Sequence, residues 1–245
     1  MRICYDLHLH SCLSPCGSED MTPSNLVNMA HLLGYDMIAL TDHNSCLNTP
    51  AAVLLGQKNG ICVVPGMELC TREEAHVVCL FPNVESAMGF HRYVSERIAK
   101  IKNRPEIFGR QLIMDENEII LGEEGTLLLN ATTIGVNDVV SAVRGFHGAA
   151  FPAHVDKSSY SVIASLGTVP PEALFTAVEL SVASNADNIL KSNPELNGKI
   201  LLHNSDAHYL ENMPDPTAWL DLPEKTPECL IAALNGAISV EWGIH

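Results

Sequence analysis

The sequence predicts an α/β fold, formed as a single domain over residues 1–245, in which helices cover a barrel of strands. Three observations predict it. Short, nearly continuous apolar segments alternate with helical segments, which is typical of a parallel sheet covered by helices. About six or seven such units follow one another, and this number suits a closed barrel better than an open sheet. No repeat, low-complexity tract or linker divides the chain.

The first hundred residues show the alternation most clearly. Residues 22–34 are typical of its helices, because Thr22 is a candidate N-cap, Pro23 suits the first turn and Gly34 suits the C-terminal stop. In this part of the chain we expect strands at 2–9, 37–43, 61–69 and 75–81, and helices at 22–34, 48–60 and 84–103.

The pattern weakens between about residues 103 and 133. This segment reads either as a β-hairpin that turns at Asp115, Glu116 and Asn117 or as a short irregular excursion from the barrel. After it the alternation resumes. We expect strands at 149–155, 176–181 and 199–208, and helices at 136–148, 183–193 and 226–236.

Composition limits the possible partners. The chain has 14 Lys and Arg against 29 Asp and Glu, for a net charge of −15. An acidic surface repels long polyanions, so long nucleic acid is not expected as a partner. A small phosphorylated ligand is still compatible, because a metal site can reverse the local potential. Oligomeric state leaves no sign in the sequence.

The N-terminus has no apolar signal segment, and no apolar run is long enough to span a bilayer. We therefore expect a cytoplasmic protein without a membrane partner. The eight cysteines are then expected to be reduced thiols. Cys12 and Cys16 are spaced as a zinc pair could be, but no second close pair completes a four-ligand site.

Histidines and acids collect at the ends of the expected strands. Side chains alternate along a strand, so Asp6, His8 and His10 are expected to share one face. In a parallel barrel the carboxyl ends of the strands meet on one face. Residues expected to converge there, with His76 at the start of its strand, are His10, His43, Glu68, His76, His154, Asp206 and His208.

Imidazole and carboxylate ligands in one place predict a site for more than one Zn, Mn or Fe ion. Any one of these histidines could instead be an ordinary hydrogen-bonding residue, and the HxH pattern alone is weak. The concentration at strand ends, beside acids, is what favours a metal site. His31, His91, His147 and His245 are expected to be structural, and His203 is expected to face away or to support the site.

In order along the chain, DLHLH at 6–10, TDHN at 41–44, GMEL at 66–69, His76, AHVD at 153–156 and NSDAH at 204–208 resemble the motifs of the PHP (polymerase and histidinol phosphatase) family of phosphoesterases. The resemblance covers most of the chain. It implies a distorted (β/α)7 TIM-like barrel and a trinuclear site. It also implies hydrolysis of a phosphoester by a metal-bound hydroxide.

Carried over by motif, the metal ligands are His8, His10, His43, Glu68, His76, His154, Asp206 and His208, with Glu68 bridging two ions. The ninth ligand is open. An Asp is common in the loop after HxH, but here Cys16 stands near that place, with Glu19 and Asp20 following. Asp20 or Glu19 is favoured and Cys16 is an alternative, since thiolates bind zinc and iron well. Asp6 and Asp42 are expected to orient histidines.

The expected function is hydrolysis of a small phosphorylated substrate, either a phosphomonoester or a short nucleotide. Arg72 and Lys157 are the candidate phosphate contacts. The candidate catalytic histidines are His43, His154 and His208, with Tyr160 as a weaker candidate proton donor. Two alternatives stay open. One is a barrel amidohydrolase acting on a C–N bond, and the other is a metal-binding module without catalysis.

Overall fold

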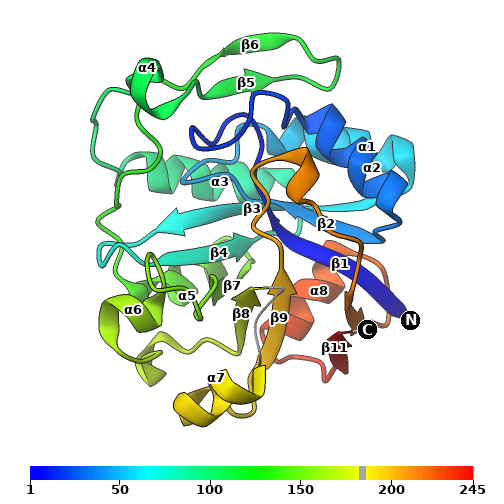
Figure 1. Ribbon diagram of the computed structural model, residues 1–245, viewed down its shortest axis with the longest axis vertical. Helices are drawn as coiled ribbons and strands as arrows, with labels where there is room; N and C mark the ends of the chain where they lie inside the picture. The colour runs from blue at the N-terminus through cyan, green and yellow to red at the C-terminus, as the bar shows by residue number, and fades with distance from the viewer. Residues whose placement is uncertain (182–185, 245) are drawn as a thin grey trace.

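A curled sheet of seven strands forms the centre of the computed structural model, which describes residues 1–181 and 186–244 (Figure 1). The strand order is β11-β10-β1-β2-β3-β4-β7. The strands of this sheet are β1 (Arg2–Leu9), β2 (Met37–Leu40), β3 (Cys62–Cys70), β4 (His76–Leu80), β7 (Ala149–Pro152), β10 (Ala218–Asp221) and β11 (Trp242–Ile244). The fold is therefore α/β, as the sequence predicts.

The sheet is mixed, which corrects the expectation of parallel strands throughout. β1, β2 and β3 are parallel, whereas β4 is antiparallel to both β3 and β7, and β10 is antiparallel to β1. Only residues 71–75 connect β3 to β4, and a parallel crossover needs about a dozen residues or more. This turn explains why His76 reaches the site from the first residue of its strand.

Two further strands, β8 (Ala177–Ser181) and β9 (Ile200–Asn204), form a separate parallel pair. β8 lies beside β7 and β9 lies beside β1, so the pair occupies the gap between the two ends of the curl. Within the described residues, no strand ladder joins this pair to the sheet. The architecture is a curled half-barrel with a strand pair at its opening.

β1 contains a bulge that separates Asp6 from the two histidines. Asp6 pairs with Ile38 and Leu9 pairs with Leu40, so three steps along β1 match two steps along β2. The extra residue reverses the alternation. Asp6 therefore lies on the opposite face from His8 and His10, and the expectation that all three share one face is wrong.

The helices cover the sheet much as the sequence predicts. Thr22 caps the first helix through Oγ1, which accepts from the Asn25 N–H at 3.1 Å, and Gly34 ends it at φ 86°. Figure 1 shows this helix packed beside α2, and its buried side chains share a core cluster with Ile38 and Leu40 of β2. The helices are α1 (Pro23–Leu33), α2 (Thr49–Asn59), α3 (Val84–Ser95), α4 (Pro105–Phe108), α5 (Val136–Arg144), α6 (Val162–Leu166), α7 (Ala186–Ser192) and α8 (Pro227–Leu234). No helix in the described ranges is long and apolar enough to cross a bilayer.

Two helices end earlier than expected, because α5 ends at Arg144 instead of continuing to residue 148, and α3 is shortened by more. The helix expected over 84–103 ends at Ser95, because Ile98 and Lys102 bridge to Thr132 and Thr126 instead of continuing the helix. The helix expected over 183–193 is seen as α7 from Ala186 onwards, and residues 183–185 lie outside the described residues.

The segment between about residues 103 and 133 contains a β-hairpin, which is one of the two forms expected for it. Its strands are β5 (Leu112–Met114) and β6 (Ile120–Glu123), at the top of Figure 1. Asp115 Oδ1 accepts from the N–H groups of Asn117 and Ile119 at 2.9 and 2.8 Å, which fixes the turn. The same excursion returns to the site, because Asn44 Nδ2 donates to the carbonyls of Leu128 and Asn130.

Candidate metal centre

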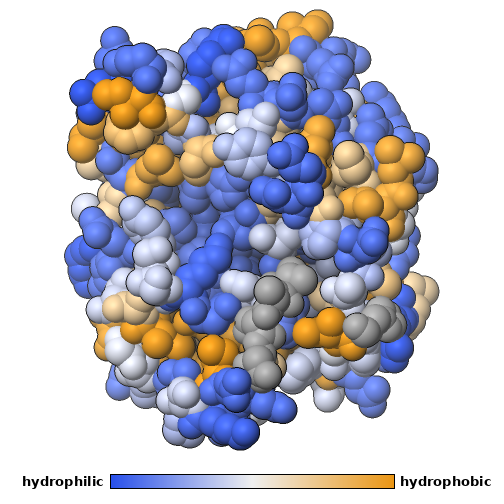
Figure 2. Space-filling model, in the orientation of Figure 1, coloured by the Kyte–Doolittle hydropathy of each residue, from blue (hydrophilic) through white to orange (hydrophobic). Residues whose placement is uncertain are grey.

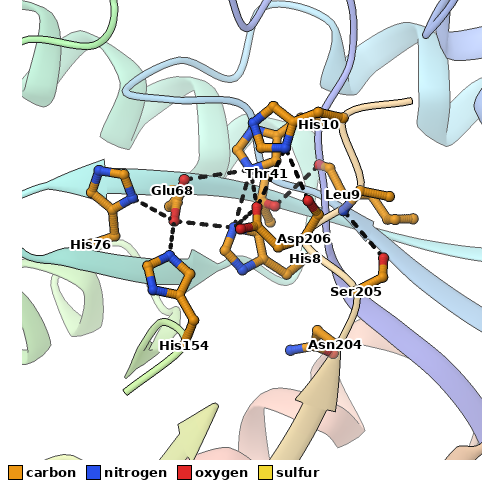
Figure 3. Close-up of polar contacts among 12 residues, drawn as sticks. His8, Leu9, His10, Thr41, Glu68, His76, His154, Asn204, Ser205 and Asp206 are labelled. Carbon is orange, nitrogen blue, oxygen red and sulfur yellow. Dashed lines mark hydrogen bonds and ion pairs between the residues drawn. The ribbon is translucent and has the colours of Figure 1, made fainter. Parts of the chain in front are cut away.

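Glu68, near the end of β3, is the centre of a buried cluster of histidines (Figure 3). Its carboxylate oxygens lie 2.8 Å from the nearest ring nitrogens of His43 and His76. Ring nitrogens of three more histidines, His8, His10 and His154, lie within 3.2–3.4 Å of it. Five histidines, from four separate segments of the chain, therefore converge on one carboxylate.

Asp206 and His208 close the cluster beyond the end of β9. Asp206 Oδ1 lies 3.4 Å from His8 Nε2 and 3.2 Å from His10 Nε2. The His208 ring stacks on that of His10 at a centroid distance of 4.0 Å. Among the described residues, three overlapping groups have donor atoms within 4.8 Å of one another: His10 with His43 and His208; His8 with His10, Glu68 and Asp206; and His43 with Glu68 and His76.

The ligand atoms of the cluster are better matched to divalent cations than to one another as hydrogen-bond partners. Glu68 Oε2, Asp206 Oδ1 and His154 Nδ1 are buried, and within the described chain they lack a hydrogen bond of good geometry. Buried polar atoms without partners are costly unless something else binds them. Imidazole nitrogens and carboxylate oxygens around a shared centre suit Zn, Mn or Fe.

Glu179 on β8 orients two of the histidines. Its carboxylate lies 2.9–3.0 Å from His8 Nδ1 and accepts from the backbone N–H of His154 at 3.0 Å. The Asn204 amide donates to it at 2.8 Å. Because His8 Nδ1 donates to Glu179, the lone pair of His8 Nε2 faces the cluster. Glu179 is not among the residues predicted from the sequence, where its only signal is a carboxylate inside the apolar strand AVELS.

Asp42 orients His10 through Ser14. The Ser14 hydroxyl donates to Asp42 Oδ1 at 2.7 Å, so it must accept from His10 Nδ1 at 2.9 Å. This leaves His10 Nε2 free to bind a cation. Asp42 thus supports a histidine as expected, although indirectly, through Ser14, which was not predicted from the sequence. Asp6 contacts backbone instead, accepting from the N–H groups of His8 and Ser205.

The histidines of the cluster strongly shift the pKa values of its two carboxylates. Burial alone would raise the pKa of Glu68, but His76, His8 and His43 lower it well below its ordinary value. Burial would likewise raise the pKa of Asp206, yet His8 and His10 lower it. Both carboxylates are therefore ionised and available as ligands at neutral pH.

The pKa values of the histidines shift in two directions, depending on the neighbouring groups. Burial lowers the pKa values of His10 and His43, and nearby histidines add to the effect. Burial also opposes protonation of His8, but Glu179, Glu68 and Asp206 raise its pKa well above the ordinary value. Glu68 raises the pKa of His76 to about 10 against the effect of burial. In the absence of metal, protons on His8 and His76 thus balance part of the negative charge.

The backbone around the site is strained at several residues, three of which are proposed ligands or directly follow one. Asn44, His154 and Asp206 have φ values of 49°, 30° and 55°. Non-glycine residues adopt such angles rarely, and they cluster where the surrounding structure holds them in place for function. Two of the three are proposed ligands, and Asn44 holds the excursion against the site.

A cavity of about 310 Å³ opens onto the cluster, and we call it the metal-site cavity. Figure 2 shows a hollow lined by hydrophilic groups near the middle of this face. The residues that line the cavity are Cys16, His43, Glu68, His76, Leu129, His154, Lys157, Ser159, Tyr160, Asp206 and His208. Of these described lining residues, only Lys157 has a permanent positive charge, and its Nζ lies 2.6 Å from Asp206 Oδ2.

Several candidate residues are not brought to the cavity. The Arg72 guanidinium is largely exposed and pairs with Glu73 at 3.0 Å. Asp20 is exposed, and the Glu19 carboxylate lies 3.7 Å from Arg110. In the loop after HxH, the structure therefore places Cys16 on the cavity and leaves both favoured acids outside.

The other histidines of the described residues lie away from the cluster. His31 and His147 are exposed, and His91 lies 3.5 Å from Ser45. His203 is buried and does not line the cavity, and burial lowers its pKa. His245 lies outside the described residues. All eight cysteines are free thiols, and burial raises the pKa values of Cys12 and Cys16 to about 12.

The curled half-barrel and the histidine-carboxylate cluster define an α/β protein with a candidate metal centre. The sequence profile of the PHP domain matches residues 6–149, which is more than half of the chain. The protein belongs to the PHP domain family, and the expected family is confirmed.

Known relatives agree with this class. Over 79 residues, which are 31% of this chain and 28% of the relative, the sequence is 33% identical to a 5′-3′ exoribonuclease of Haemophilus influenzae. The lesion-specific endonuclease Q of Pyrococcus furiosus has the same fold, with a TM-score of 0.73 and 17% identity over 99% of this chain. A Bifidobacterium adolescentis chain provisionally described as a metal-dependent phosphoesterase matches with a TM-score of 0.59 and 17% identity, over 83% of this chain and 87% of its own.

This chain spans only part of the first two relatives, 58% of the endonuclease and 28% of the exoribonuclease. A second endonuclease Q structure, with a TM-score of 0.69 and 17% identity over 98% of this chain and 58% of its own, holds a 27-mer duplex with an abasic lesion at the active site. The expectation that long nucleic acid is excluded is therefore wrong. Net charge does not report the local potential of a cavity, which bound cations can reverse.

Proposed function

We propose that this protein is a metal-dependent phosphoesterase with a (β/α)7-type barrel, acting on a phosphomonoester or a nucleotide. One observation carries the proposal, namely the approach of five histidines to within 3.4 Å of the Glu68 carboxylate. Two to three Zn, Mn or Fe ions would be held by His8, His10, His43, Glu68, His76, His154, Asp206 and His208.

Such ions supply an activated water and neutralise charge on the phosphate oxygens. The chain's own groups do the remaining work. Lys157, on the cavity wall, is placed to bind a phosphate oxygen, and its contact with Asp206 raises its pKa and keeps it charged. His43, His154 and His208 line the same cavity. Any of these three that is not bound to a metal ion would be a candidate proton donor to the leaving alcohol.

The test is hydrolysis of p-nitrophenyl phosphate and bis-p-nitrophenyl phosphate with added Mn, in the wild type and in His43→Ala. We expect Mn-stimulated turnover that His43→Ala largely removes, with little change in the unfolding midpoint of the metal-free protein. His31→Ala, at an exposed helical histidine, is the matched control. Unchanged hydrolysis in His43→Ala would contradict the site. Turnover of amides alone would favour the amidohydrolase, and metal binding without any turnover would favour a binding module.

A further inference from the structure

A short turn on the rim of the metal-site cavity supplies both a charge and an aromatic ring. Lys157, Ser159 and Tyr160 all line the cavity from this turn. The Ser161 hydroxyl donates to the Lys157 carbonyl at 2.7 Å and accepts from the Ala164 N–H at 3.1 Å, where it caps α6. Ser161 therefore closes the turn and joins it to α6.

Tyr160 is held in an unfavourable position for a tyrosine. Its φ is 54°, in the left-handed region, and 54% of its surface is exposed. Its carbonyl accepts from the His76 N–H at 2.8 Å. Its ring lies nearly parallel to the His76 imidazole, at 22°, with the centroids 5.0 Å apart. One face of the ring thus covers a proposed ligand, and a large part of the side chain stays open at the cavity.

We propose that Tyr160 is a stacking platform for a flat ring of the substrate, and that it determines specificity for a nucleobase next to the scissile phosphate. This inference rests on the proposed phosphoesterase function. Lys157 would bind the phosphate three residues away on the same turn, so a base attached through a sugar could reach Tyr160. A rigid aromatic side chain gives contact area with little loss of conformational entropy.

The ring would discriminate by class of substrate and not by sequence. Every nucleobase has a flat face, whereas a sugar phosphate has none, and base–aromatic stacking tolerates any base. Leu129, from the excursion, adds an apolar side chain to the same cavity, where a purely ionic substrate would gain nothing from it. The short similarity to an exoribonuclease agrees with a nucleotide-bearing substrate.

The test compares wild type, Tyr160→Phe and Tyr160→Leu on adenosine 5′-phosphate and adenosine 3′-phosphate, each beside the ribose phosphate that lacks the base. The measured quantity is the ratio of kcat/KM for the nucleotide to that for its base-free counterpart. Tyr160→Leu, which keeps apolar bulk but has no aromatic face, should lower this ratio by about 5- to 150-fold. Tyr160→Phe should keep the ratio within about twofold of the wild type, since only the hydroxyl is lost.

Two kinetic outcomes overturn the proposal. An equal loss on both substrates with Tyr160→Leu would mean that the ring only supports His76. A fall in the ratio with Tyr160→Phe as large as with Tyr160→Leu would assign the role to the hydroxyl. Calorimetric binding of the same four compounds to the Mn-loaded protein separates this inference from the proposed function, because it needs no turnover. If none of the four compounds is hydrolysed, stacking is supported when the nucleotides bind more tightly than the ribose phosphates and Tyr160→Leu abolishes this difference. Equal binding of the nucleotides and the ribose phosphates refutes it.

Discussion

His8 Nδ1 lies 2.9–3.0 Å from both carboxylate oxygens of Glu179, and both side chains are fully buried. The relationship joins residues 171 positions apart. It fixes the tautomer of His8, and the same carboxylate fixes the His154 backbone and the Asn204 amide. The position of β8 thus sets the direction of His8 on β1.

Glu179→Gln should weaken metal binding by about 10- to 100-fold, the usual cost of losing a group that orients a metal-binding histidine. The amide presents one acceptor oxygen where the carboxylate presents two. Competition with a chelator of known affinity would measure the change. Glu172→Gln, at an exposed position, is the control. Equal metal affinity in Glu179→Gln and wild type would show that His8 needs no such partner.

Lys157→Met should lower kcat for phosphate esters by roughly 10²- to 10³-fold, the cost of removing one well-placed charge-stabilising donor. Metal content should stay at the wild-type level, because Lys157 contacts Asp206 but is not itself a ligand. Steady-state kinetics and metal analysis on the same preparation would show both effects. Lys58→Met, on the exposed side of α2, serves as the comparison. A variant with normal kcat would rule out Lys157 as the phosphate contact.

Asp6 should make the metal-free protein less stable as the pH rises through about 6. Burial raises the pKa of Asp6 to about 6, above the unfolded value of about 3.9. The folded state therefore favours the protonated form, and that contribution is fully present below about pH 4 and is lost above pH 6.

Asp6→Asn removes this titration and keeps an oxygen for the N–H groups of His8 and Ser205. Relative to wild type, its free energy of unfolding should rise by about 1–3 kcal/mol between pH 4.5 and 7.5. Denaturant unfolding at the two pH values measures this difference. Asp215→Asn, at an exposed acid, should show no such trend. A flat difference for Asp6→Asn would refute the raised pKa.

The ninth ligand can be tested in the loop after HxH. Asp20→Asn should leave metal content unchanged, because Asp20 is exposed, whereas Cys16 lines the cavity. Mass spectrometry of bound metal in Asp20→Asn and Cys16→Ser gives the answer. A loss of metal confined to Cys16→Ser would identify a thiolate ligand. A loss confined to Asp20→Asn would mean that the loop moves when metal binds.

Much of the candidate site could be predicted from the sequence because strand periodicity and strand ends are local signals. The motifs around His10, His43, Glu68 and Asp206 each lie at or just beyond a strand end, so a parallel arrangement was enough to bring them together. The helix boundaries at Thr22 and Gly34 depend on capping within one turn, which is also local.

The parts that could not be predicted depend on contacts between distant segments. The bulge in β1 is defined by its register against β2, and no local pattern marks it. Ser14 and Glu179 act only because Asp42 and His8 are brought beside them by the fold. Arg72 follows a strand directly, as a site residue would, but its side chain turns outward to Glu73.

The most direct test of the account is the metal stoichiometry of the wild type and of Glu68→Gln, measured by mass spectrometry after loading with Mn or Zn. Glu68 contacts five histidines, so its loss should disturb more than one ion. We predict two to three equivalents per chain in the wild type and in the control His31→Ala, and at least one equivalent fewer in Glu68→Gln. The same stoichiometry in all three proteins would contradict a metal centre organised around Glu68.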